Sequence, residues 1–121
     1  MGAKKNPRRL RHYTKIATNG TGYVRSDRLG LGQVLACQSI GFRNRTGARG
    51  TLELYIKQGE ARTFIADQTS PLANRWYWYP YTQHIKEGEQ LEAQQASCLQ
   101  NDELDLHIIG YITYGVEEVT T

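Results

Sequence analysis

The sequence predicts an all-β fold, an antiparallel β-sandwich with an extended basic N-terminal arm, for which a jelly roll is one suitable topology. Three observations lead to this fold class. The 121 residues are enough for one domain with its own core. Eight Tyr, two Trp and twelve Gly favour strands and turns over helices. Alternating apolar runs are separated by turn residues every 8–12 residues or so, about the spacing expected of a sandwich.

The first strands are expected to be short. Residues 11–17 and 21–25 are strand-like, and the turn Asn19-Gly20 separates them. A glycine-spaced loop then leads into a long strand over residues 33–44. Its inward face is predicted to contain Val34, Ala36, Ile40 and Phe42, with Gln38 as a polar exception.

The clearest alternation is in residues 51–57, where Leu52, Leu54 and Ile56 are expected to face inward. Residues 61–66 form a further strand after a turn. Residues 90–98 suit a strand or a helix by propensity. We predict a strand, because the apolar period continues in the next segment and a Glu-Gly-Glu turn precedes it.

The last strand is predicted over residues 103–114, and Gly110 is expected to mark a bulge or a close approach of the backbone. Its core residues are expected to be Leu104, Leu106, Ile108 and Ile112.

Residues 75–81 (RWYWYPY) are dense in aromatic side chains and are expected to be extended, with Pro80 confining the strand to an edge or ending it. Alternation places Trp76 and Trp78 on one face and Tyr77 and Tyr79 on the other. Because large aromatic residues are enriched at interfaces, we predict that the two tyrosines and Tyr81 contact a partner and that the tryptophans pack inside. The alternatives are a sugar-binding platform, or a segment covered on both faces within the domain.

Charge divides the chain. Residues 1–26 contain seven basic side chains and no acidic ones, whereas the other 95 residues contain eight basic and twelve acidic groups. This predicts a basic arm over residues 1–20, a β-sandwich over 21–115 and an acidic tail over 116–121. The first ten residues are expected to be mobile until they lie along an acidic partner; the alternative is a solubilising tail. The basic residues predicted to bind the partner are Lys4, Lys5, Arg8, Arg9, Arg11 and Lys15.

Catalysis, metal binding and cofactors are not expected. The three histidines, His12, His84 and His107, lack the spacing of metal ligands. No serine or cysteine occupies a nucleophile motif. Two groups of acidic residues are expected to be solvated at turns: Glu87, Glu89 and Glu92, and Asp102, Glu103 and Asp105.

Nothing in the sequence suggests secretion or a membrane. No apolar run follows the basic N-terminus, and no stretch is long enough to span a bilayer, so neither a signal peptide nor a membrane partner is expected. Cys37 and Cys98 suit two buried free thiols, with one disulfide bridge as the alternative.

An ordered set of segments resembles small β-sandwich accessory proteins of bacteriophage virions. These segments are the strand ending in Asn-Arg-Thr-Gly, the strand TLELYI, the hairpin IKEGEQLEAQQAS and the final strand LDLHIIGYI. The resemblance extends over residues 23–112; the aromatic segment and the basic arm depart from it. It implies a non-enzymatic capsid decoration or cement protein, or a neck or tail accessory protein.

Two classes of function therefore remain. The first is a virion structural protein, made in the host cytoplasm, that binds the major capsid protein or neck and tail subunits. Proteins of this type commonly form homo-oligomers, with a trimer as one form. The second is a β-sandwich module that binds carbohydrate or nucleic acid, for which steep salt dependence would indicate nucleic acid.

Overall fold

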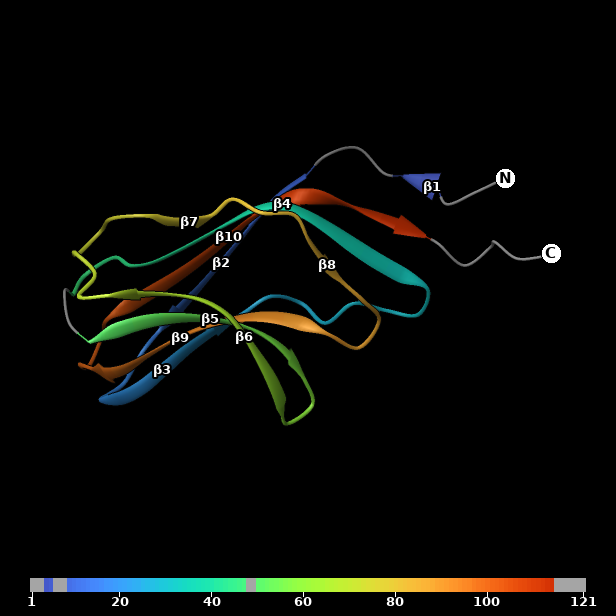
Figure 1. The fold of residues 1–121 in the computed structure, drawn as a ribbon. Helices are drawn as coiled ribbons and strands as arrows, with labels where there is room; N and C mark the ends of the chain where they lie inside the picture. The colour runs from blue at the N-terminus through green and yellow to red at the C-terminus, as the bar shows by residue number, and fades with distance from the viewer. Residues whose placement is uncertain (1–3, 6–8, 48–49, 115–121) are drawn as a thin grey trace.

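The computed structural model describes residues 4–5, 9–47 and 50–114. Every regular element in this part of the chain is a β-strand. The strands form two antiparallel sheets that lie face to face, as Figure 1 shows. The predicted β-sandwich is therefore confirmed.

Sheet A is built around two long central strands that pair with each other over most of their length. Two strands share each of its edge positions, so that six strands occupy four positions. In spatial order they are β1 (Lys4–Lys5) and β2 (Arg9–Ile16), β10 (Glu103–Tyr114), β4 (Gln33–Asn44), and β7 (Tyr77–Tyr79) with β8 (Gln83–Ile85).

Sheet B has four strands in the spatial order β3 (Gly20–Arg25), β9 (Gln90–Cys98), β5 (Thr51–Gln58) and β6 (Ala61–Thr69). Between β2 and β10 the chain changes sheet at every connection except the β5–β6 hairpin and the step from β7 to β8. Eight sheet positions connected in this way form a jelly roll. Strands β2 and β3 are consecutive in the chain and are each the edge of their sheet.

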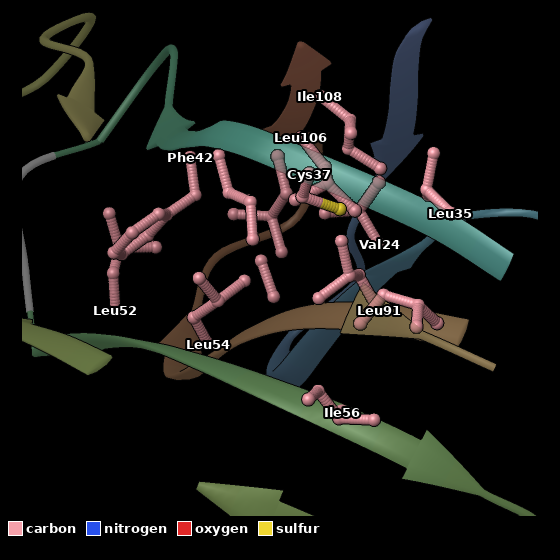
Figure 2. Packing of buried hydrophobic residues seen from close by; sticks show 14 of the residues in the cluster. Val24, Leu35, Cys37, Phe42, Leu52, Leu54, Ile56, Leu91, Leu106 and Ile108 are labelled. Atoms are coloured by element: carbon pink, nitrogen blue, oxygen red, sulfur yellow. The ribbon is translucent and has the colours of Figure 1, made fainter. Parts of the chain in front are cut away.

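The core lies between the sheets, and Figure 2 shows its apolar side chains reaching inward from both layers. The alternation predicted for β5 and β10 is confirmed, because every residue assigned to the core there is buried. These residues are Leu52, Leu54, Ile56, Leu104, Leu106, Ile108 and Ile112.

Strand β4 departs from the predicted alternation. Leu35 and Cys37 belong to the core cluster, whereas Val34 and Ala36 do not. Ser39 pairs with Ile109 and Cys37 with the next residue, Gly110, which leaves Gln38 without a partner across the ladder. This β-bulge reverses the facing of residues on its two sides, and it explains the polar exception.

The edge of sheet A formed by β7 and β8 is interrupted beside this bulge. Strand β7 ends at Tyr79, before Pro80, and β8 resumes pairing with β4 two residues after Tyr81. Pro80 thus ends an edge strand, as predicted. The sequence pattern missed β8, which has only three residues.

The N-terminal region also differs from expectation. Lys4–Lys5 pairs with the end of β10, and Arg9–Ile16 pairs with β10 along its length. The sandwich therefore begins before residue 21, although residues 4–16 are strongly basic. Strand pairing uses backbone groups, so the polar side chains of an edge strand do not prevent it. Arg8 and the tail over residues 116–121 lie outside the described residues.

Both cysteines are buried, and they are thiols rather than partners in a disulfide. Cys37 lies on β4 in sheet A, and Cys98 ends β9 in sheet B. Burial raises the pKa of the Cys37 thiol to about 12, so this thiol stays protonated and inert at neutral pH.

Candidate functional site

The outer face of sheet A contains both tryptophans of the chain. Gly41 of β4 pairs with Trp78 of β7 and, on its other side, with His107 of β10. The Trp78 ring lies over Gly41, since a Cβ built on that glycine would come within 2.6 Å of the ring. Because this outward position is a glycine, the indole can pack directly against the backbone of β4.

Two histidines complete an aromatic cluster, which we define as His12, His107, Trp76 and Trp78. The indole rings stack at 5.6 Å with an interplanar angle of 27°. His107 contacts both indoles edge-on, and His12 contacts Trp76 in the same way. The cluster spans the four strand positions of sheet A, and 45% of Trp78 remains exposed.

A buried carboxylate lies beside the cluster. Asp105 of β10 is fully buried and accepts hydrogen bonds from Arg43 Nε at 2.6 Å and Thr14 Oγ1 at 2.8 Å. The Arg43 guanidinium lies 4.3 Å from the centre of the Trp76 ring. Burial alone would raise the pKa of Asp105, but the hydrogen bonds from Arg43 and Thr14 and the charges of Arg43 and Arg45 lower it overall. The ion pair between Arg43 and Asp105 thus positions the guanidinium group that packs against the Trp76 ring.

The predicted facing of the aromatic segment is wrong. Tyr77 and Tyr79 pack against the core, and the two tryptophans lie on the outer face. The tyrosines pair with Phe42 and Ile40, whose side chains are buried. The Tyr77 hydroxyl also accepts a hydrogen bond from the Leu72 backbone at 2.8 Å, so it holds the preceding loop. Tyr81 is exposed, and its ring contacts Tyr79 at 5.4 Å.

The outer face of sheet B is built differently. Glu92 of β9 is fully buried and accepts hydrogen bonds from Arg25 Nε at 2.6 Å and Arg62 Nε at 2.7 Å. Both guanidinium groups lie over the Tyr23 ring, at 4.8 and 5.7 Å from its centre. Phe64 is the large aromatic residue left exposed on this face. Sheet B therefore covers its outer face with compensated charge.

The expectation that the acidic groups are solvated is wrong for three of them. Glu92, Asp102 and Asp105 are buried. Asp102 accepts hydrogen bonds from Asn44 Nδ2 at 3.3 Å and from the Leu99 backbone at 3.0 Å. These carboxylates are bound by partners inside the fold, which favours a structural role.

Five of the six predicted basic residues lie in strands at one edge of sheet A. Lys4, Lys5 and Arg9 lie in β1 and β2. Arg11 and Lys15 pair with Ile108 and Leu104, so they share the face of sheet A that looks toward sheet B. Arg11 and Lys15 are therefore on the opposite face of β2 from His12 of the aromatic cluster.

The two histidines of the cluster share a hydrogen bond, because their Nδ1 atoms are 3.1 Å apart. One Nδ1 must therefore be protonated and donate the hydrogen bond, while the other is unprotonated and accepts it. His12 Nε2 also lies 3.6 Å from an Asp105 oxygen. Burial, and then the proximity of His12, lower the pKa of His107 from its ordinary value of 6.5.

This lowered pKa predicts a pH-dependent stability. In the unfolded chain His107 binds a proton more readily than in the folded chain. The contribution of His107 to the free energy of unfolding is therefore fully present above pH 6.5, and it is lost as the pH falls through the pKa of the folded state. Thermal unfolding at about pH 7 and about pH 5 should show a smaller loss for His107→Gln than for the wild type. His84→Gln, which changes an exposed histidine on β8, should lose as much as the wild type. An equal loss in all three proteins would contradict the prediction.

No three His, Cys, Asp or Glu side chains within the described ranges group in a way that could bind a metal ion. The described part of the chain also contains no helix that is long and apolar enough to cross a membrane.

Comparison with known proteins does not assign a family. No protein-family model matches the chain, and a search of curated sequences found no match. Two solved structures are similar at 12% identity. One is a chain of infectious bursal disease virus, Gt strain, with a TM-score of 0.34 over 93% of this chain and 33% of that one. The other is Eiger TNF from S. frugiperda, with a TM-score of 0.32 over 96% and 99% of the two chains.

The chain spans about a third of the length of the viral chain.

Proposed function

We propose that this protein is a non-enzymatic structural protein of a bacteriophage particle that binds neighbouring virion subunits as a capsid decoration or cement protein. The observation that carries the proposal is the aromatic cluster on the outer face of sheet A. Its partly exposed Trp78 lies on a rigid sheet, and tryptophan is the residue type most enriched among interface hot spots.

Two further features support this proposal. The segments from Tyr23 to Ile112 resemble phage virion β-sandwich proteins, which gives the kind of assembly. The carboxylates buried beneath the outer faces are each bound by arginine side chains, so the surfaces around them are held in one conformation. A preorganised surface loses little entropy when it binds a partner.

The proposal makes Trp78 a binding residue. Trp78→Ala should weaken binding of the full chain to assembled particles by about 30-fold, which corresponds to about 2 kcal/mol. Thermal unfolding should change little, because Trp78 covers Gly41 and does not enter the core. Binding can be measured by co-sedimentation with particles purified without this protein.

Phe64→Ala is the matched control, since it removes an exposed aromatic side chain from the outer face of sheet B. It should leave binding within about twofold of the wild type. Equal binding by Trp78→Ala and the wild type would overturn the interface. Retention of the wild type on a glycan resin, lost in Trp78→Ala, would instead make the cluster a carbohydrate site.

The proposal includes self-association on the particle, with a trimer as the form to test. Sedimentation velocity of the purified chain gives its mass in solution. A monomer at all concentrations would mean that the particle itself orders the copies.

A further inference from the structure

A groove opens between β2 and β3, where the edges of the two sheets lie side by side. It encloses a volume of about 440 Å³, and a second hollow of about 370 Å³ continues it. The two hollows share the lining residues Lys15, Tyr23 and Arg25. The groove is therefore bounded by two strands, each belonging to a different sheet.

The face of β2 that looks toward sheet B has two basic side chains with no acidic partner among the described residues. Lys15 lines both hollows. Arg11 lies beyond them, four residues earlier on the same face of β2, the face that looks toward sheet B. Within residues 9–47 and 50–114, neither side chain makes an ion pair or a hydrogen bond. By contrast, Arg25, Arg43 and Arg62 are each bound to a buried carboxylate. The groove thus attracts an acidic ligand.

The backbone of β2 offers a second means of recognition. Strand β2 pairs with β10 on one side, and no described strand pairs with its other side. A free strand edge has unpaired N–H and C=O groups that an extended peptide can bind as an added strand. Residues of such a peptide four positions apart would lie opposite Arg11 and Lys15, so acidic side chains there would form cross-strand ion pairs.

The aromatic residues at the groove argue against single-stranded nucleic acid. Binding of nucleic acid of this kind depends on rings that are free to stack on bases. Tyr13 packs against the core, and its hydroxyl donates a hydrogen bond to Asp27 at 3.3 Å. The Tyr23 ring is covered by the guanidinium groups of Arg25 and Arg62. Neither ring is free.

We propose that the groove between β2 and β3 binds an extended acidic peptide, which adds to the free edge of β2 and places carboxylates against Arg11 and Lys15. The proposal deepens the function given above, because it names the chemistry of one partner contact. The source of the peptide on a particle rests on that function. The chemistry of the groove does not, and a peptide experiment without particles tests it separately.

The probe is a fluorescein-labelled peptide of eight residues, the length of β2, in which glutamate alternates with threonine. Fluorescence anisotropy with the full chain should show saturable binding that weakens as salt is added. The same peptide with lysine in place of glutamate should not bind. Methylation of alternate backbone nitrogens, tested in both registers, should abolish binding in one register, because the added strand then lacks its hydrogen-bond donors.

The protein variants test the site itself. Lys15→Glu and Arg11→Glu should each weaken binding of the peptide by about tenfold or more. Lys86→Glu is the matched control and should stay within about twofold, since Lys86 is an exposed lysine beside β8, at the opposite edge of sheet A. Lys15→Ala, with a smaller loss in the same direction, covers the case in which charge reversal alters folding.

Three outcomes would overturn the proposal. The first is no binding of the glutamate peptide at millimolar concentration. The second is an equal loss in Lys86→Glu, which would mean that net charge alone attracts the peptide. The third is tight binding of single-stranded oligothymidylate that is lost in Lys15→Glu, which would make the groove a nucleic-acid site. If Trp78→Ala leaves particle binding unchanged while the glutamate peptide still binds as expected, the proposed function is wrong and the peptide site in the groove is retained.

Discussion

Leu54→Ala is expected to lower the free energy of unfolding by about 3 kcal/mol, within the 2–5 kcal/mol or so typical of such a change in a core. Leu54 is fully buried at the centre of β5 (Figure 2). Its cross-strand partners are Ala66 on β6 and Ala93 on β9. Because both neighbours are small, they cannot fill the cavity that the substitution leaves. Urea denaturation followed by fluorescence measures the loss.

Glu53→Ala is the control on the opposite face of the same strand. Glu53 accepts hydrogen bonds from the Tyr55 hydroxyl at 3.1 Å and from Gln94 Nε2 at 2.9 Å. These bonds are close to solvent, so their loss should cost no more than about 1 kcal/mol. A loss as large as that of Leu54→Ala would mean that the facing of β5 is reversed.

The inward residues of β5 and β10 could be predicted because their apolar side chains alternate without interruption. In β4 the alternation fails, because the bulge at Gln38 adds one residue that the other strand does not match. A single sequence shows such a residue only as a polar exception. Its effect on the facing of Leu35 and Cys37 depends on pairing with β10, which lies more than sixty residues away.

The aromatic surface was half predictable. Alternation shows that Trp76 and Trp78 share a face, but it does not say which face is the outer one. Pairing decides this, because Trp78 lies opposite Gly41, whereas the tyrosines lie opposite Ile40 and Phe42. The signal in the sequence was a glycine at an outward position between two core residues, which leaves room for a large ring.

Charge patterning identified the basic segment but not its structure. Seven basic residues without an acidic one suggest an arm, yet β2 occupies part of that segment as an edge strand. In the same way, the sequence pattern predicts that Glu92 and Asp105 are solvated, because the arginines that form ion pairs with them come from distant strands. Long-range pairing determines which charges are compensated.

Gly110 marks a place where this long-range pairing leaves no room for a side chain. It faces the bulge of β4, where the partner strand has its extra residue. A Cβ at this position would collide with the carbonyl oxygen of Ala36 and lie 3.0 Å from Cys37 Cα. Both are backbone atoms of the neighbouring strand, so no change of rotamer can relieve the contact.

Gly110→Ala is therefore expected to lower the free energy of unfolding by about 3 kcal/mol, at the upper end of the usual range for overpacking. The physical reason is that β4 and β10, the two central strands of sheet A, would have to separate at the bulge. Gly30→Ala is the control, because a Cβ there meets only the flexible end of the Gln33 side chain, at 3.2 Å. It should cost less than about 1 kcal/mol. Equal stability of Gly110→Ala and the wild type in urea denaturation would mean that the two strands do not approach this closely. The bulge at Gln38 would then not explain why residue 110 is a glycine.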